Sequence, residues 1–429
     1  MSAPTIIDTL NARGFISQIT ETGLPEESAQ RPVTAYCGFD PTAPSLHIGH
    51  AIQALALGHF QRHGHRVIAL VGGGTGLIGD PSGRSDERKL LSKDDAAANV
   101  ARIKHQLSGF LSFEGENPAI IADNYDWLGE WRLVDFLRDI GKHFTVNMML
   151  AKDSVRTRLE DREHGISFTE FSYMLLQSAD YLHLHEHYGC NVQIGGSDQW
   201  GNITAGIDLV RRVTGKQVHG ITSALLTSSS GQKFGKSAGN ALWLDPTMTS
   251  PYQAYQFWMN ADDRDVVRYL KMLTMLELDE IALLEQQVAE HPERREAQRC
   301  LAYEFTAIIH GAATARSAQI ASDILFGREG IAPSEALRGE VVDLLQREIP
   351  VYHAPPAELE AGISIIQALV AAGLAPSNSQ ARRLVQQNSV ALNGALVTAE
   401  ASVSSGDMLD GRAALLRSGK RSYALVLAE

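Results

Sequence analysis

The feature that most constrains the fold is a strand, a helix and a second strand in direct succession near the start of the chain. VTAYCGF (33–39) is a short apolar strand, and a helix with core-facing apolar spacing is expected from about His47 to His63, capped by Gly64. RVIALV (66–71) is a continuous apolar run of the kind that is buried in a parallel sheet. This order predicts a βαβ unit with a right-handed crossover, and therefore an α/β domain.

Further along, the first two hundred residues keep this character. A glycine-rich turn at 72–83 follows the second strand, and CNVQIGG (190–196) is another buried strand with a helix behind it. The pattern then becomes helical over 251–326, with few glycines and charged faces. At 429 residues the chain is long enough for two or three domains.

The C-terminal part divides into two stretches. Residues 327–361 carry four prolines and read as a connector. The remainder predicts two helices, near Ile363 and after SNSQ (377–380), and then a hairpin that turns at Asn393-Gly394.

Charge and composition limit the classes of partner. The formal net charge is −12, whereas 362–429 carry six basic against four acidic residues, so any RNA must bind at a local patch. No apolar run approaches the ~20 residues that span a bilayer, and the N-terminus lacks a signal-peptide pattern. Three dispersed cysteines without a CxxC pair argue against a structural zinc site and suit a reducing compartment. We expect a cytoplasmic protein with no membrane partner and no bound metal.

The tetrapeptide His47-Ile48-Gly49-His50 opens the first expected helix. Its histidines lie three residues apart and share one face, and Gly49 lets another group approach the backbone closely. A helix N-terminus presents unpaired N–H groups and a partial positive charge, so phosphates bind there readily. The alternative is a capped helix with two solvated histidines.

A second candidate is the polar, glycine-rich loop SSSGQKFGKSAGN (228–240). Lys233 and Lys236 lie three residues apart with Gly235 between them, which suits a lid that folds over a polyphosphate. Alone, such a loop is usually a solvated surface turn. Downstream of HIGH on an α/β scaffold, a catalytic role is favoured.

Together these motifs resemble those of class I aminoacyl-tRNA synthetases, which combine HIGH with a KMSKS-type loop. The loop here, KFGKS, departs at its two middle positions but keeps both lysines and the final serine, Ser237. YCGFDPTAPSLHIGH (36–50), FTEFSYMLLQSADYL (168–182) and QIGGSDQWGN (193–202) resemble tyrosyl-tRNA synthetases in particular. SNSQARRLVQQNSVALNG is similar to the S4-type RNA-binding module of bacterial members, so the resemblance covers nearly the whole chain.

The resemblance implies activation of L-tyrosine by ATP to tyrosyl-adenylate and pyrophosphate, then transfer of tyrosine to the 3′ end of tRNA(Tyr). The tyrosine carboxylate, with a pKa of about 3.5, is already ionised at pH 7, so the reaction needs alignment and charge stabilisation rather than a general base. We assign His47 and His50 to the phosphates, and Lys233 and Lys236 to the pyrophosphate in the transition state. Mg²⁺ is expected to arrive with ATP.

By the same resemblance, Tyr36 and Asp180 hydrogen-bond the phenol hydroxyl of tyrosine. Phenylalanine would leave such a buried pair unpaired, which is how a hydroxyl-reading site rejects the deoxy analogue. The family places Tyr173, Gln177 and Asp80 on the substrate ammonium. Tyr173, Gln177 and Asp180 are spaced by four and three, so one helix can present all three to one cavity. For the two tyrosines alone, core packing is the alternative.

The remaining assignments lie at the nucleotide. Asp198 follows the strand QIGG, at the carboxyl edge where open α/β sheets bind ligands, although it could equally be a helix N-cap. The family puts Asp198 and Gly196 on the ATP ribose and Gln199 near the reacting carboxylate. The ATP-binding set implied by the resemblance is Asp40, Thr42, His47, Gly49, His50, Gly196, Asp198, Lys233, Lys236 and Ser237.

We therefore expect an α/β protein of several parts. In order, these are a Rossmann-like parallel-sheet catalytic domain (1–225), the KFGKS catalytic loop and connector (226–245), an α-helical anticodon-binding domain (246–326), a linker (327–361) and a small α+β S4-type RNA-binding domain (362–429). RNA contacts are expected from Arg382, Arg383, Arg417, Lys420 and Arg421. Family members are homodimers, and FTVNMML (144–150) is a candidate part of the interface.

Other interpretations remain open at this stage. A tryptophan-specific synthetase is disfavoured by Asp180 and Tyr36, which suit a phenol. HxGH nucleotidyltransferases share the first motif but do not explain the helical domain and RNA module. An RNA-binding or splicing-type protein on a decayed synthetase scaffold is disfavoured by the intact HIGH and both loop lysines. His183 and His187 suggest zinc, but no cysteine or carboxylate cluster completes a tetrahedron nearby, so a solvated helix face is favoured.

Overall fold

The computed structural model describes residues 4–82, 91–160, 165–229, 231, 241–326, 336–419 and 422–429. They form two compact units: unit 1 contains residues up to 249 together with 261–301, and unit 2 contains 250–260 and 302–429. Five predicted functional residues lie outside the described residues: Lys233, Lys236, Ser237, Lys420 and Arg421. Within the described segments, no helix is long and apolar enough to cross a membrane.

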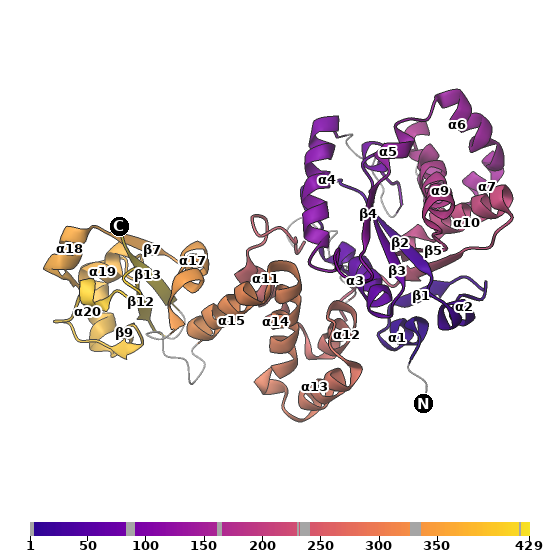
Figure 1. Ribbon diagram of the computed structural model, residues 1–429. Helices are drawn as coiled ribbons and strands as arrows, with labels where there is room; N and C mark the ends of the chain where they lie inside the picture. The colour runs from indigo at the N-terminus through magenta and orange to yellow at the C-terminus, as the bar shows by residue number, and fades with distance from the viewer. Residues whose placement is uncertain are drawn as a thin grey trace. The chain divides into compact units, whose positions relative to one another are not determined.

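Unit 1 is built on a six-stranded sheet in the order β1-β6-β5-β2-β3-β4 (Figure 1). The strands are β1 (Ile16–Ile19), β2 (Thr34–Phe39), β3 (Arg66–Val71), β4 (Ile120–Asp123), β5 (Val192–Gly196) and β6 (His219–Ser223). β2 to β6 run parallel, whereas β1 pairs antiparallel with β6 at the edge. The three strands predicted from apolar runs are confirmed as β2, β3 and β5, which lie together in the sheet.

Helices cover both faces of this sheet. The helices that precede residue 215 are α1 (Ile6–Ala12), α2 (Leu24–Gln30), α3 (Ile48–Arg62), α4 (Lys93–Leu107), α5 (Tyr125–Leu128), α6 (Leu133–Asp139), α7 (Val146–Leu150), α8 (Asp153–Glu160), α9 (Phe168–Tyr188) and α10 (Trp200–Thr214). Figure 1 shows α3 and α4 on one side of the strands and α9 and α10 on the other. The strand order reverses between β2 and β5, and ligands of open α/β sheets bind at such a switch point.

The βαβ unit predicted at the start of the chain is confirmed. α3 joins β2 to β3 and packs against both strands and β5. It begins after His47, which is its N-cap, and ends before Gly64, whose φ of 80° is the left-handed conformation that glycine adopts at helix ends.

The helical stretch predicted over 251–326 is also confirmed. It contains α11 (Pro251–Met259), α12 (Asp263–Leu273), α13 (Leu278–Glu290), α14 (Glu296–His310) and α15 (Ala312–Phe326). These helices do not form one compact unit, because α12 and α13 belong to unit 1 while α11 and α15 belong to unit 2.

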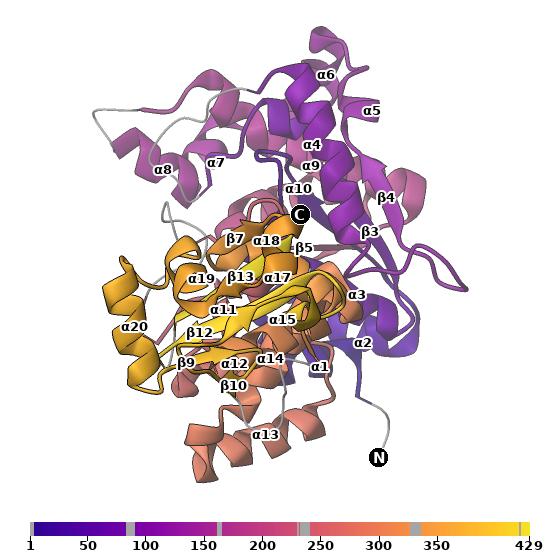
Figure 2. The same ribbon diagram turned by 90° about the vertical axis from the view of Figure 1, so that its left-hand side faces the viewer.

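Unit 2 contains a five-stranded sheet in the order β10-β9-β12-β13-β7 (Figure 2). Besides α11 and α15, unit 2 contains α17 (Gly339–Glu348), β7 (Val351–Ala354), α18 (Pro356–Ala361), β8 (Ile363–Ser364), α19 (Ile365–Ala371), α20 (Asn378–Gln386), β9 (Val390–Leu392), β10 (Ala395–Leu396), β11 (Ser402–Val403), β12 (Ala413–Ser418) and β13 (Ser422–Ala428). The predicted hairpin is confirmed: Asn393 and Gly394, with φ of 49° and 88°, form the two-residue turn between β9 and β10.

Both faces of this second sheet are buried. Leu416 and Val426 pack into a core with α19 and α20, whereas Leu415 and Leu425 pack into another core with α15 and α17. Alternation of side chains along a strand explains why β12 and β13 are apolar on both faces.

Residues 339–361, which we expected within a connector, instead form α17, β7 and α18, and β7 pairs parallel with β13. The prolines there mark element boundaries. Pro350 directly precedes β7, and Pro355 and Pro356 open α18 at positions where a helix tolerates a missing N–H.

Candidate active site

Residues from separate sequence stretches, among them the predicted Asp40 and Asp198, meet at the carboxyl edge of the central strands, where each strand ends. Asp40 directly follows β2, Gly72 follows β3, Asn124 follows β4, and Asp198 lies two residues after β5. A Cβ at Gly72 would lie 2.0 Å from Oδ1 of Asp40, so the glycine-rich turn leaves room for that carboxylate. Loops at this edge therefore carry the polar groups, while the strands beneath them are apolar.

The HIGH motif differs in one respect from its prediction. The first N–H groups of α3 are not unpaired: Gly49 N–H donates to Nδ1 of His47 at 3.0 Å, Ile48 N–H donates to the Leu242 carbonyl, and His50 N–H donates to the His47 carbonyl. A Cβ at Gly49 would lie 2.9 Å from Cε1 of His47. The group that approaches this glycine closely is thus the His47 ring itself.

Both imidazoles are oriented by backbone donors. Nδ1 of His47 accepts from Gly49, and Nδ1 of His50 accepts the His47 N–H at 3.2 Å. An Nδ1 that accepts leaves the proton of a neutral ring on Nε2. The two half-buried rings lie 4.0 Å apart, so they present neighbouring Nε2–H donors that suit phosphate oxygens.

Asp180, on α9, is a buried carboxylate with two neutral donors. The Trp127 indole N–H donates to Oδ1 at 2.8 Å and the Asn124 side chain donates to Oδ2 at 2.9 Å. Burial raises the pKa of Asp180 to about 8, against the hydrogen bonds from Asn124 and Trp127, which lower it. Nearby, the hydroxyl of buried Tyr36 has no hydrogen-bond partner among the described residues, and its ring packs edge-on against Tyr181.

Tyr173 lies on the same helix and faces several carboxylates. Its hydroxyl donates to Oδ2 of Asp40 at 2.7 Å, and Thr75 donates to Oδ1 of Asp40 at 2.7 Å. Burial raises the pKa of Tyr173 well above its usual value, helped by the negative charges of Asp40, Asp80 and Asp180. A cationic group would be stabilised in these surroundings.

A chain of side-chain amides connects three more predicted residues. Gln199 donates to Oδ2 of Asp80 at 2.6 Å, and Ser82 N–H donates to Oδ1 at 2.9 Å. Asn202 donates to the side-chain oxygens of both Gln177, at 3.0 Å, and Gln199, at 3.2 Å. Asp80, Gln177 and Gln199 thus form one network.

The other nucleotide-side residues lie in turns at the same edge. Gly196 ends β5, and a Cβ there would lie 2.7 Å from Oδ1 of Asp198, the middle residue of a 3₁₀ turn (Ser197–Gln199) before α10. Thr42 is half-buried in the loop between β2 and α3, where its N–H donates to the Asp40 carbonyl.

Four residues that hydrogen-bond predicted site residues were missed from the sequence: Asn124 and Trp127, which donate to Asp180, Thr75, which donates to Asp40, and Asn202, which donates to Gln177 and Gln199. The first two follow the apolar run AIIA (119–122), which becomes β4. Reading that run as a parallel strand would have placed NYDW at the carboxyl edge.

The HLHEH stretch lies near the end of α9. His183 stacks on His187 and on Trp127, with ring centroids 4.0 and 4.1 Å apart. Across the described residues there is no group of three or more histidine, cysteine or acidic side chains that could hold a metal ion.

The predicted RNA contacts occupy two settings in unit 2. Arg382 and Arg383 are exposed on α20, whereas Arg417 is half-buried in β12. The first pair suits an RNA surface better than Arg417 does.

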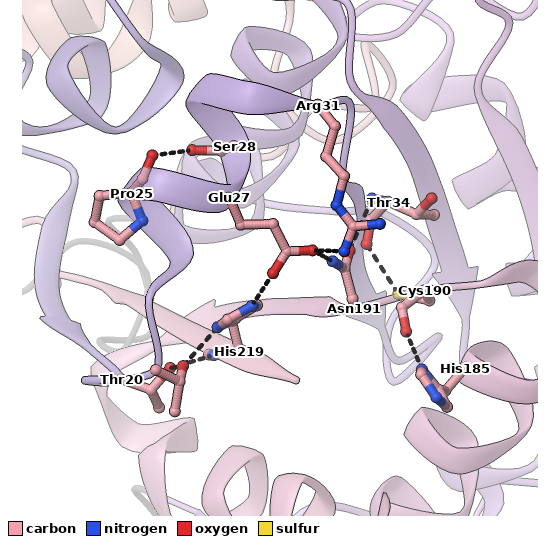
Figure 3. Close-up of polar contacts among 12 residues, drawn as sticks. Thr20, Pro25, Glu27, Ser28, Arg31, Thr34, His185, Cys190, Asn191 and His219 are labelled. Atoms are coloured by element: carbon pink, nitrogen blue, oxygen red, sulfur yellow. Dashed lines mark hydrogen bonds and ion pairs between the residues drawn. The ribbon is translucent and has the colours of Figure 1, made fainter. Parts of the chain in front are cut away.

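A different polar cluster lies at the amino edge of the unit 1 sheet (Figure 3). Glu27 of α2 accepts from Asn191 at 2.7 Å and contacts Nε2 of His219 at 2.8 Å. Nδ1 of His219 in turn contacts Thr22 at 2.5 Å. Burial acts to raise the pKa of Glu27, but the hydrogen bond and charge of His219, with Arg31, lower it below its usual value.

Comparison with known proteins agrees with this arrangement. The model of "tRNA synthetases class I (W and Y)" matches residues 27–327, and that of the "Tyrosine--tRNA ligase SYY-like C-terminal domain" matches 343–426. The tyrosine–tRNA ligase of Roseiflexus castenholzii is 50% identical over 426 residues, 98% of this chain and 99% of its own. That of Geobacillus stearothermophilus is 47% identical over 434 residues, with the same two coverages.

Solved structures add the three-dimensional comparison. A C-terminally truncated mitochondrial tyrosyl-tRNA synthetase from Aspergillus nidulans has a TM-score of 0.69 at 32% identity, covering 76% of this chain and 95% of its own. Sequence motifs, fold and relatives agree, and the chain belongs to the class I tRNA synthetases of the tryptophan and tyrosine group.

Proposed function

We infer that the protein is a tyrosine–tRNA ligase, which converts L-tyrosine and ATP to tyrosyl-adenylate and pyrophosphate and then transfers tyrosine to the 3′ end of tRNA(Tyr). The observation that carries the choice of amino acid is the buried pair at one end of the site. Asp180 is buried and accepts from Asn124 and Trp127, and the nearby Tyr36, whose pKa the charge of Asp180 helps burial to raise, has a hydroxyl without a partner among the described residues. A phenol hydroxyl can bond to both groups.

The substrate ammonium lies beside Tyr173, Gln177 and Asp80. Support comes from the negative surroundings of Tyr173 and from the amide network that holds Gln177 and Asp80 in place. Gln199, in the same network, lies near the reacting carboxylate. Tyr173 also bonds to Asp40, which we had assigned to the nucleotide, so Asp40 lies where the two substrates meet.

On the ATP side, His47 and His50 donate from Nε2 to phosphate oxygens as negative charge builds. Gly196 and Asp198 hold the ribose, and Thr42 and Gly49 line the nucleotide. Lys233 and Lys236 close over the pyrophosphate, Ser237 contributes to ATP binding, and Mg²⁺ accompanies ATP. The tyrosine carboxylate attacks the α-phosphorus, the bond to the β-phosphate oxygen breaks, and no proton has to be removed.

In the second step a terminal ribose hydroxyl of tRNA attacks the carbonyl of the adenylate and AMP leaves. Residues 246–326 contribute the anticodon-binding part, and the C-terminal domain binds RNA through Arg382 and Arg383, with Arg417, Lys420 and Arg421. Exposed arginines on a helix suit phosphate contacts to structured RNA.

The working form is a homodimer in the cytoplasm. Large apolar side chains are exposed in the stretch around the predicted interface: Leu133 (73%), Val134 (75%), Val146 (60%) and Phe168 (78%). Exposed large apolar side chains of this kind support a protein–protein interface. Sedimentation should give a dimer that Val134→Asp and Val146→Asp weaken; a wild-type monomer at micromolar concentration would contradict the assignment.

The function is tested by amino-acid-dependent ATP–pyrophosphate exchange with the purified protein. Tyrosine should support exchange, and tryptophan and phenylalanine should not at comparable concentration. If tryptophan supported exchange better than tyrosine, the choice of substrate would be wrong. The assignment to the synthetase class would still hold.

A further inference from the structure

Trp127, one of the two residues that hold Asp180, sits on a weak element. α5 is a single turn of four residues with no buried residue and no side-chain cap. A helix this short is not stable by itself, so the indole needs support from elsewhere.

That support comes from α9, a helix of 21 residues. Asp180 and His183 lie three residues apart and share a face of this helix. Asp180 accepts the indole N–H at 2.8 Å, and the His183 ring stacks on the indole face, with centroids 4.1 Å apart and planes 11° from parallel. One helix face therefore contacts Trp127 at two points, one polar and one aromatic.

The stack continues outward. His187, one turn further along α9, lies 4.0 Å from His183 at 19°, and its Nδ1 is 2.9 Å from the His183 carbonyl. Burial, helped by the charge of His187, lowers the pKa of His183 to about 4, so its ring is neutral at pH 7 and packs as an aromatic surface. His187 is exposed, so the stacked rings of Trp127, His183 and His187 connect the buried Asp180 to the protein surface.

We propose that His183 is a positioning residue for tyrosine recognition: by stacking on Trp127 it keeps the indole N–H on Asp180, and thereby keeps the acceptor of the phenol hydroxyl in place. The inference rests on the proposed role of Asp180. It assigns a function to the HLHEH stretch that neither a metal site nor a solvated face describes.

The test is tyrosine-dependent exchange in a set of variants. His183→Ala should raise KM for tyrosine about three- to tenfold and lower the preference for tyrosine over phenylalanine, with kcat within about twofold. His183→Phe keeps a stacking surface and should restore KM. Glu186→Ala, an exposed neighbour on α9, is the matched control and should match wild type.

A double-mutant cycle separates positioning through Trp127 from general damage. Trp127→Phe removes the N–H, so His183→Ala should have little further effect on KM in that background. Equal effects of His183→Ala with and without the indole N–H, or no rescue by His183→Phe in a protein that still unfolds cooperatively, would overturn the inference.

Asp180→Asn distinguishes this failure from failure of the pocket assignment. If Asp180→Asn leaves KM and the amino-acid preference unchanged, the assignment of the slot is wrong. If Asp180→Asn impairs tyrosine use but His183→Ala does not, only the role of His183 is wrong.

Discussion

The amino and carboxyl edges of the unit 1 sheet, where its parallel strands begin and end, both carry buried or half-buried polar groups, and the two edges differ in what those groups do. At the amino edge, Glu27, Asn191, His219 and Thr22 are hydrogen-bonded to one another, and the pKa of Glu27 is lowered. At the carboxyl edge, Asp180 has neutral donors and a pKa raised to about 8. At the amino edge, the polar groups form hydrogen bonds with one another and so stabilise the fold. At the carboxyl edge, polar groups remain able to form hydrogen bonds with a ligand.

The largest effect on activity should come from removing the carboxyl group of Asp180, at the carboxyl edge. Asp180→Ala should lower kcat/KM for tyrosine-dependent exchange by about 10³ or more, because the phenol loses its acceptor and Trp127 and Asn124 lose theirs. For Glu27→Gln, at the amino edge, kcat/KM for the same reaction should stay within about twofold of the wild-type value at 25 °C. If both variants lost activity to a similar extent, the two edges would not differ in function as described above.

The next largest effect tests the phosphate end. Lys236→Ala should lower kcat for adenylate formation by about 10², since a lysine that contacts pyrophosphate in the transition state acts on the rate. Tyrosine affinity should hardly change. Weaker tyrosine binding with a normal rate would remove Lys236 from the mechanism.

Much of this could be anticipated from the sequence, and the limits are physical. The βαβ unit, the hairpin at Asn393-Gly394 and the shared helix face of Tyr173 and Asp180 follow from local patterns. The partners of buried polar groups do not, because Trp127 and Asp180 are far apart in the chain and meet only through the crossover order of the sheet. The expectation of a connector at 327–361 was wrong because sequence alone does not distinguish a proline that begins an element from one that interrupts it. Pro350 precedes β7, and Pro355 and Pro356 open α18.

Unit 2 offers a comparison with a core that is almost wholly apolar, so its function should depend on surface groups. Replacing Arg382 and Arg383 by alanine should raise KM for tRNA about tenfold and reduce the salt slope of binding by about two, with exchange unaffected. These side chains are exposed, and folding should be unchanged. Truncating the chain at Pro355 would test RNA binding less cleanly. It would remove β12 and β13, whose side chains share a core with α17, and so could destabilise the remainder. Normal charging and salt dependence in the double variant would place RNA binding elsewhere.

The two edges should also differ in stability, because the free energy of unfolding should respond to pH with opposite sign at each of them. A raised pKa at Asp180 means that wild-type stability is lost as pH rises from about 4 to 8, so Asp180→Asn should gain on wild type over that window, by at most about 1.4 kcal/mol per pH unit. For Glu27 the pKa is lowered, so the advantage of wild type over Glu27→Gln is present above pH ~4.5 and lost on acidification. Denaturant unfolding across pH 3 to 9 measures both, and slopes of the same sign would contradict the account.

The central claim is that polar groups at the carboxyl edge bind the phenol of the substrate. Its most direct test is how well the Tyr36→Phe variant discriminates between tyrosine and phenylalanine. Deleting a buried hydroxyl that has no hydrogen-bond partner in the described part of the chain should not destabilise the free protein, so any change in selectivity reports on the substrate. The ratio of kcat/KM for the two amino acids, measured by ATP–pyrophosphate exchange, should fall about tenfold relative to wild type, mainly through poorer use of tyrosine. An unchanged ratio in a stably folded variant would show that Tyr36 only packs in the core and that its hydroxyl does not read the phenol.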